Sequence, residues 1–222
     1  MATTTTNFGW DIPQSTDLVK DGATAIAALG QDIDTAFVDF KGGTTGQVLK
    51  KTSGTDLDVE WGTASSGLTL INTTSFSGVT SISLNNVFSA TYDKYKIIVK
   101  TTHVSSAKVE FRYRVGGVDA SGSNYDTQRS SEAGTSATSN TRTLSGTIHS
   151  LGTNADTQHF NIIELQDPFL ASNSGLLYFE SNGANIDTAG GAHTLSTSYD
   201  GFTLFSSAGN FSGTIRVYGY AN

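Results

Sequence analysis

The feature that most constrains this chain is a series of short runs, from residue 68 onward, in which apolar and polar residues alternate. In KVEFRYRV, Val109, Phe111 and Tyr113 alternate with charged side chains. A period of two places the apolar side chains on one face of a β-strand. The runs predicted as strands are 68–74, 79–84, 94–103, 107–115, 141–149, 157–166, 175–182, 193–199, 201–206 and 212–220. Because no long helical pattern interrupts them, we expect residues 68–222 to form an antiparallel β-sandwich of jelly-roll type.

One helical pattern precedes this β region, at residues 15–41. Thr16 or Ser15 is a candidate N-cap, Asp17 falls in the first turn, and the sequence KGG ends the pattern. Isoleucine at two core positions favours a coiled coil of three or more helices. A single helix of this length is marginal alone in water. We therefore expect a trimeric coiled coil, with packing on the chain's own β domain as the alternative. The residues at heptad spacing, predicted to form the trimer contact, are Val19, Gly22, Ile26, Leu29, Ile33, Ala36 and Phe40.

Two further segments flank the helix. Residues 42–67 are predicted as a β-hairpin and linker, with a strand at 46–51, a turn at TSGTD, and a second strand in which Leu57, Val59 and Trp61 alternate with acidic residues. A lone hairpin is marginal in water, so this segment also needs neighbours. Residues 1–14 form a polar tail, and we expect it to dock on a partner, with a staple onto the chain's own helix as the alternative. The predicted docking residues are Phe8, Trp10, Ile12 and Pro13.

Composition excludes several classes of partner. The net charge is -7 and there is no basic stripe, so we expect no nucleic-acid partner. The chain has no cysteine, which removes disulfides and thiolate ligands. No run approaches the roughly 18 apolar residues that span a bilayer, and the threonine-rich start is not a signal peptide, so we expect no membrane insertion.

Two polar stretches are predicted as loops. Residues 116–140 carry the side chains that suit a sugar, because an aromatic ring stacks on its apolar face and polar groups take its hydroxyls. A hairpin tip without a ligand is the alternative. The second stretch, 182–193, is predicted as a solvated loop, with Asp187 and His193 in a metal or sugar site as the alternative. The receptor-binding candidates in the first are Asp119, Asn124, Tyr125, Asp126 and Arg129.

Catalytic signals are weak. There is no G-x-S-x-G, no P-loop and no cysteine nucleophile, and acidic pairs such as Glu164 with Asp167, or Asp119 with Asp126, occur in any acidic chain. The four histidines have no metal-ligand spacing and are predicted to be structural or on the surface. We therefore expect no enzyme activity, no catalytic or metal-binding residues, and no cofactor.

Four stretches of the sequence resemble tailed-bacteriophage virion proteins of the tail-fibre, minor tail and head-fibre type. They are FGWDIPQSTDLVKDGATAIAALGQDIDTAF, TTGQVLKKTSGTDLDVEWGT, NNVFSATYDKYKIIV and SGTIRVYGYAN, which fall in order and cover about half of the chain. The resemblance implies a homotrimer assembled in the host cytoplasm and exposed on the exterior of the virion. Its N-terminus would attach to other virion proteins, and its β domain would bind a host-surface glycan or protein. Because the chain is short for a tail fibre, a head fibre or capsid decoration protein without a primary receptor role is the alternative.

Overall fold

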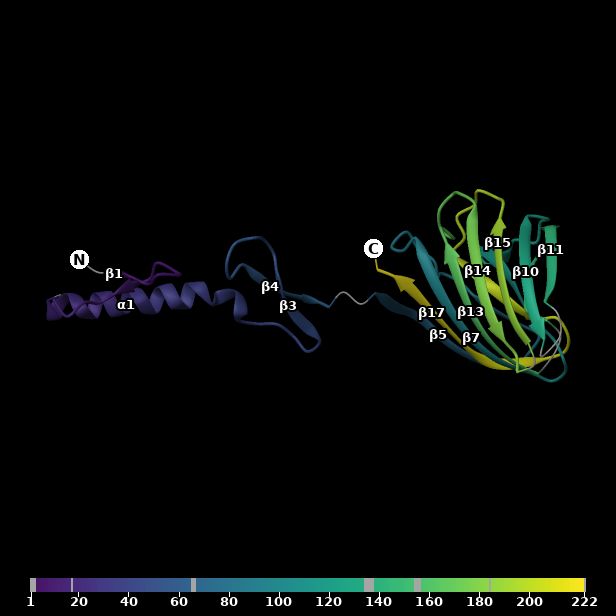
Figure 1. Cartoon of the computed structure of the whole chain (residues 1–222), viewed down its shortest axis with the longest axis horizontal. Coiled ribbons are helices and arrows are strands. Elements are labelled where there is room, and N and C mark those ends of the chain that lie inside the picture. Colours follow the sequence, from purple (N-terminus) through teal and green to yellow (C-terminus); the bar gives the residue numbers. More distant parts are fainter. Residues whose placement is uncertain are drawn as a thin grey trace. The chain divides into compact units, whose positions relative to one another are not determined.

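The computed structural model describes residues 3–16, 18–64, 67–133, 138–153, 157–183 and 185–221. The chain is mainly β, with 53% of residues in strands and 10% helical, and its sheets are antiparallel. It divides into two compact units, Met1–Ser65 and Ser66–Asn222, shown in Figure 1. The expected mainly β fold with one helix is confirmed.

The first unit combines one helix with two small strand pairs. Its elements are β1 (Thr3–Thr4), β2 (Asp11–Ile12), α1 (Val19–Ala36), the 3-10 helix η1 (Val38–Phe40), β3 (Gln47–Lys51) and β4 (Val59–Thr63). Strands β1 and β2 pair with each other, and β2 contacts α1 (Figure 1). Strands β3 and β4 form the predicted hairpin, in which Leu49 lies opposite Trp61 and the Lys50 ammonium lies 2.9 Å from the Glu60 carboxylate.

The helix is shorter than predicted at both ends. It begins at Val19, and the extended backbone of Leu18, with no side-chain cap, precedes it. The predicted caps at Ser15 and Thr16 are therefore wrong, and Asp17 lies outside the described residues. At the other end Phe37 leaves the α-helical region at φ -103° and ψ 8°, and the chain tightens into η1. The last heptad position, Phe40, consequently lies outside the α-helix.

The second unit consists of two antiparallel sheets. Its strands are β5 (Leu68–Val79), β6 (Ser81–Leu84), β7 (Lys94–His103), β8 (Val109–Val115), β9 (Val118–Asp119), β10 (Tyr125–Ala133), β11 (Ser139–Gly146), β12 (His149–Leu151), β13 (Gln158–Gln166), β14 (Ser174–Ser181), β15 (Asn185–His193), β16 (Gly201–Ser206) and β17 (Phe211–Tyr220). The eight-stranded sheet has the order β11-β10-β15-β14-β13-β7-β17-β5, and the five-stranded sheet has the order β12-β8-β16-β6 with β9 paired to β8.

This arrangement corrects three predictions. Most of the predicted loop at 116–140 is strand, since β10 and β11 pair across it, and most of the predicted loop at 182–193 is β15. The predicted strand at 193–199 is wrong, because β15 ends at its first residue and the chain then runs without a strand to β16.

The core of the second unit is made by the inner faces of the alternating strands. Val109, Phe111 and Tyr113 of β8 are fully buried, as the period of two predicts. On the other sheet Ile97 of β7 and Ile163 of β13 are buried in the same way, opposite each other in register. Burial of such side chains contributes roughly 1.5–3 kcal/mol each, so this unit has a core of its own.

The described residues of the second unit begin and finish at the same place. Leu68 at the start of β5 pairs with Tyr220 at the end of β17. Beyond them, the Ala221 N–H donates a hydrogen bond of 3.3 Å to the Gly67 carbonyl.

Candidate functional site

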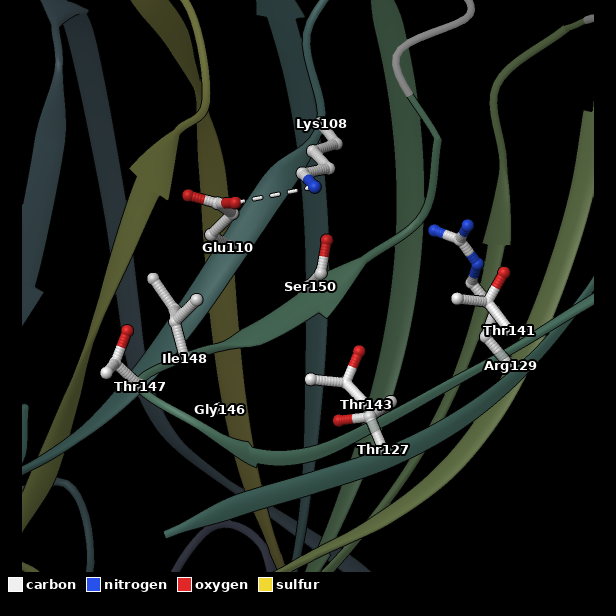
Figure 2. A pocket seen from close by; sticks show the side chains of 10 residues that line it. All are labelled: Lys108, Glu110, Thr127, Arg129, Thr141, Thr143, Gly146, Thr147, Ile148 and Ser150. Carbon is white, nitrogen blue, oxygen red and sulfur yellow. Dashed lines mark ion pairs between the residues drawn. The ribbon is translucent and has the colours of Figure 1, made fainter. Parts of the chain in front are cut away.

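One hollow of the β unit is a cleft of about 240 Å³ where edge strands of the two sheets meet (Figure 2). Strands β8 and β12 supply one wall, and β10 and β11 supply the other. Its lining residues are Lys108, Glu110, Thr127, Arg129, Thr141, Thr143, Gly146, Thr147, Ile148 and Ser150. The cleft, called the edge cleft below, is therefore rich in hydroxyl groups and carries two cations and one carboxylate.

The charged groups of the edge cleft are already partly compensated. The Lys108 ammonium lies 3.6 Å from the Glu110 carboxylate on the β8 wall. On the opposite wall Thr127 is 2.7 Å from Nδ1 of His149. Among the described residues that line the cleft none is aromatic. Its chemistry suits a small polar ligand bound through hydroxyl and charge-assisted hydrogen bonds.

Arg129 is fixed by groups buried behind the cleft. One guanidinium nitrogen donates to the Gly152 carbonyl, and Nε lies 3.7 Å from Oδ1 of Asp187. Asp187 is fully buried, so its charge needs this cation close by. Thr153 also donates to Oδ2 of Asp187, at 3.3 Å. A held guanidinium loses little freedom when a ligand binds, which favours recognition.

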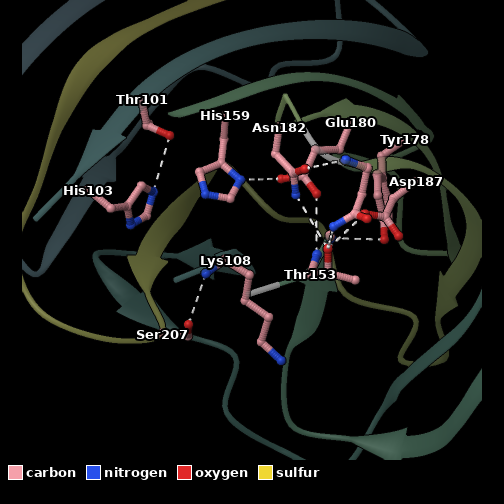
Figure 3. A network of polar contacts seen from close by, with 12 residues as sticks. Thr101, His103, Lys108, Thr153, His159, Tyr178, Glu180, Asn182, Asp187 and Ser207 are labelled. Carbon is pink, nitrogen blue, oxygen red and sulfur yellow. Dashed lines mark hydrogen bonds and ion pairs between the residues drawn. The ribbon is translucent and has the colours of Figure 1, made fainter. Parts of the chain in front are cut away.

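The polar network continues into the sandwich (Figure 3). Nδ1 of His159 lies 2.6 Å from Oε1 of Glu180, and both side chains are fully buried. The Thr153 N–H donates to the other oxygen of Glu180, at 3.3 Å. Burial raises the pKa of the Glu180 carboxyl, and the hydrogen bond and charge of His159 oppose this rise. Glu180 lies opposite Asp187 on the neighbouring strand.

Gly152 is a glycine that this network requires. Its φ is +97°, and a Cβ added there would lie 1.5 Å from Oε2 of Glu180. The Gly152 N–H donates to the Tyr178 hydroxyl at 3.0 Å, while its carbonyl receives Arg129. The backbone at this point therefore connects the buried carboxylate to the wall of the edge cleft.

The four histidines are all buried in the β unit. Of the two positions predicted for them, structural or on the surface, they take the structural one. Tyr125 contacts two of them edge-on, with ring centroids 4.8 Å from His149 and 4.4 Å from His193. His103 and His159 form a second edge-on pair at 4.8 Å. Burial lowers the pKa of His103 to about 4 and that of His149 to about 3, and it also lowers the pKa of His193. The rings of His103, His149 and His193 are therefore neutral at pH 7.

The predicted receptor-binding residues do not gather in one place. Tyr125 is fully buried and donates to the Ala120 carbonyl at 2.7 Å, so its ring has no face free for a sugar. Asp119 pairs with Arg114 and accepts a hydrogen bond from Thr203. Of the five, only Arg129 lines the edge cleft.

The two others are occupied near their strand ends. The Asp126 carboxylate accepts the Ser145 N–H at 2.7 Å, and the Asn124 carbonyl accepts the Thr194 N–H at 2.9 Å. Sequence reasoning missed Lys108, Thr143 and Ser150, because threonine and serine are ordinary strand residues and give no local signal of a site.

The predicted trimer residues divide into two stripes on α1. Gly22, Leu29 and Ala36 are half-buried, although a Cβ added at Gly22 would meet open space. Val19 is 96% exposed and Ile26 is 64% exposed, and the other predicted residues of that stripe, Ile33 and Phe40, are also exposed. Within the described part of the first unit no side chain is buried.

The tail residues predicted to dock on a partner form an aromatic cluster. Phe8 stacks on Trp10 at 4.8 Å, and Trp10 meets Phe37 edge-on at 6.4 Å. Trp10 therefore packs against the chain's own helix at its C-terminal end, which differs from the N-terminal staple given as the alternative. Phe8 and Ile12 nevertheless stay exposed, and Pro13 is half-buried, so an apolar surface remains for a partner.

The carboxylates considered for catalysis are engaged elsewhere. Glu164 lies 3.4 Å from the Lys94 ammonium and accepts the Tyr220 hydroxyl at 2.7 Å. Within the described ranges no group of three or more histidine, aspartate or glutamate side chains is placed to hold a metal ion. In the same ranges no helix has the length and apolar character needed to cross a membrane.

Comparisons with known proteins add no assignment. No protein-family model matches the chain, and no curated protein matches it significantly.

Proposed function

We propose that this chain is a structural protein of a bacteriophage virion, a short homotrimeric fibre. Its N-terminal unit joins the copies and attaches them to the particle, and its β unit binds the host surface. The sequence motifs quoted above support the assignment to bacteriophage virion proteins. The separation of the chain into two compact units supports separate roles for the N-terminal and β units.

The observation that carries the proposal is the absence of a buried side chain in the described part of the first unit. An 18-residue helix gains too little from its own hydrogen bonds to persist in water. Here the stripe of Val19, Ile26 and Ile33 faces solvent at heptad spacing. Three such helices bury this stripe against one another, which supplies the missing core. Assembly of the trimer through a coiled coil explains why the stripe is apolar.

The tail completes the attachment end. Phe8 and Ile12 remain exposed beside the stacked Trp10. Aromatic anchors of this kind dominate protein interfaces when they enter a pocket of the partner. Another virion protein is the proposed partner of this surface.

The edge cleft is the proposed host-binding site, with a glycan as the ligand. Its volume of about 240 Å³ is of the size of a single sugar unit, and its Thr127, Thr143 and Ser150 hydroxyls match sugar hydroxyls. Each such contact is weak, but three copies in one fibre bind with avidity. This explains how a small cleft without an aromatic platform serves adsorption.

The mass of the chain in solution tests the assembly. Full-length protein and a variant that begins at Gly67 are compared by sedimentation. We expect a trimer for the full chain and a larger dissociation constant for the variant, because the latter lacks α1. A monomeric full chain refutes the homotrimer.

Host binding is tested with Thr143→Val, which removes one hydroxyl from the cleft and keeps the shape. Thr69→Val in β5 is the matched control, because Thr69 does not line the cleft. We expect the first variant to bind immobilised host polysaccharide several-fold more weakly and the control to bind as the native chain. Equal binding by both variants refutes the cleft as the receptor site.

Immunogold labelling of particles separates the fibre positions. Label at the tail tip agrees with adsorption. Label on the capsid shell supports the alternative, a head fibre or decoration protein, and removes the receptor role.

A further inference from the structure

The outward face of the eight-stranded sheet carries a second apolar surface. Five large side chains on three adjacent strands are exposed there. They are Phe160 (48%) and Ile162 (38%) on β13, Leu177 (62%) and Phe179 (42%) on β14, and Ile186 (48%) on β15. These five residues are called the sheet patch below.

The sheet patch is contiguous because its members are neighbours in register. Ile162 lies opposite Phe179 on one side and Ile98 on the other. Phe160 lies opposite Ser181, which in turn lies opposite Ile186. The Cβ atoms of directly opposed residues on one face are about 4.5–5.5 Å apart, so the side chains of the patch form one continuous surface.

The patch also has relief. Leu177 stands between two hollows, of about 400 Å³ and about 200 Å³, and it lines both. Glycines take the place of side chains beside it, since Gly190 lines one hollow and Gly175 and Gly191 line the other. A protruding leucine with glycine-floored hollows on either side suits interdigitation with protein side chains rather than contact with water alone.

The size of the patch matches one side of a stable interface. A fully exposed large apolar side chain presents roughly 150–250 Å², so the exposed fractions of the five correspond to about 500 Å². A standard interface buries about 800 Å² per partner, of which roughly 55–65% is apolar. The sheet patch supplies that apolar share.

We propose that the sheet patch is a self-association surface, covered by further copies of this chain in the homotrimer. Two features point to another copy as the occupant. The exposed heptad stripe of α1 already indicates self-association. The flanks of the patch also carry opposite charges, with Lys100 on β7 at one side and Glu132 on β10 at the other. In a cyclic trimer the basic flank of one copy meets the acidic flank of the next, while the patches converge on the axis.

This inference rests on the proposed function only in that the chain forms a homotrimer. It goes further by assigning the β unit an assembly surface of its own. The consequence is that breaking the helical contact alone does not abolish association.

Cross-linking of single-cysteine variants tests the placement directly. The chain has no cysteine, so Phe179→Cys and Val118→Cys each introduce one thiol into the full-length protein. Val118 is 69% exposed and lies on β9 of the other sheet, which makes it the matched control. With a short-arm bis-maleimide we expect covalent dimer from Phe179→Cys at least ten times the amount from Val118→Cys. Equal yields overturn the inference.

Sedimentation of charge variants separates the two contacts. We expect Leu177→Lys to raise the dissociation constant of the trimer at least tenfold, and Val118→Lys to leave it unchanged. We expect Ile26→Lys, which breaks the helical stripe, to leave residual association that Leu177→Lys removes. If the native chain is a trimer but Leu177→Lys behaves as Val118→Lys, the sheet patch is refuted and the proposed function stands. If the native chain is monomeric, the homotrimer itself fails.

Discussion

Acid should unfold the β unit because its buried histidines are held neutral. Burial lowers the pKa of His103 to about 4 and that of His149 to about 3, whereas a histidine in the unfolded chain titrates near 6.5. Below pH 6.5 the histidines of the unfolded chain therefore bind protons that the same histidines do not bind in the folded chain. The free energy of unfolding falls as the pH falls, until the folded-state pKa values are reached.

The magnitude follows from the two shifts. Each pH unit below 6.5 costs about 1.4 kcal/mol per histidine. Between pH 7.5 and 4.5, His103 and His149 together remove about 5 kcal/mol of stability, and His193 acts in the same direction. For a domain of this size that is a drop in Tm of roughly 10–20 °C.

The groups that face these rings modify the effect without reversing it. His103 lies against His159 and is hydrogen-bonded to Ser206 at 2.9 Å, and His149 lies near Asp126 and the neutral His193. The raised pKa of Glu180 works in the opposite sense, since that carboxyl takes up a proton more readily when folded than when unfolded. One carboxyl offsets part of the loss from the histidines.

Thermal unfolding of the full chain, followed by far-ultraviolet circular dichroism at pH 7.5, 6.0 and 4.5, measures this dependence. The His149→Gln variant keeps a polar partner for Thr127 without a titrating ring. We expect it to lose about half as much stability as the native chain over this range. The reasoning is refuted if the Tm of the native chain changes by less than about 3 °C, or if His149→Gln shows the native pH dependence.

Three other predictions concern single side chains, each measured by urea unfolding at pH 7.5. Gly152→Ala should destabilise the β unit by about 3 kcal/mol or more, because its Cβ collides with the Glu180 carboxylate. The control Gly116→Ala, at φ +56° with open space around it, should cost about 1 kcal/mol. Equal losses would show that backbone strain at positive φ, and not the collision, causes the destabilisation. Tyr125→Phe should cost roughly 1–3 kcal/mol, because it leaves buried backbone groups without partners. Tyr220→Phe, which removes a half-exposed bond to a carboxylate, should cost less than about 1 kcal/mol, and a loss as large as that of Tyr125→Phe would contradict this ordering.

Strands with an apolar inner face were predictable, and strands with a polar inner face were not. The buried positions of β8 are Val109, Phe111 and Tyr113, so its period of two is visible. In β15 the inward residues Asp187 and His193 are polar and fully buried, and in β10 the polar Arg129 faces the same network. A search for hydrophobic periodicity cannot detect a strand whose core contacts are hydrogen bonds and ion pairs. Both segments were therefore predicted as loops.

The same limit applies to the candidate site. Arg129 was predicted because arginine with acidic and amide neighbours suits a sugar, yet its actual partners, Asp187 on β15 and Gly152 just after β12, lie far from it in the sequence. Tyr125 was misplaced because a tyrosine in a polar run looks exposed, while its hydroxyl in fact bonds the backbone of Tyr113 and Ala120. The heptad spacing of α1 was visible in the sequence, whereas the contact of Trp10 with Phe37 depends on the path of the N-terminal tail, which spacing does not encode.

The hydrogen bond between Ala221 and Gly67 holds the two described ends of the β unit side by side. A body whose first and last strands leave side by side, as β5 and β17 do, can be spliced into a loop of a host protein without stretching that loop. An exchange of the β unit for another such body would therefore leave the first unit unchanged.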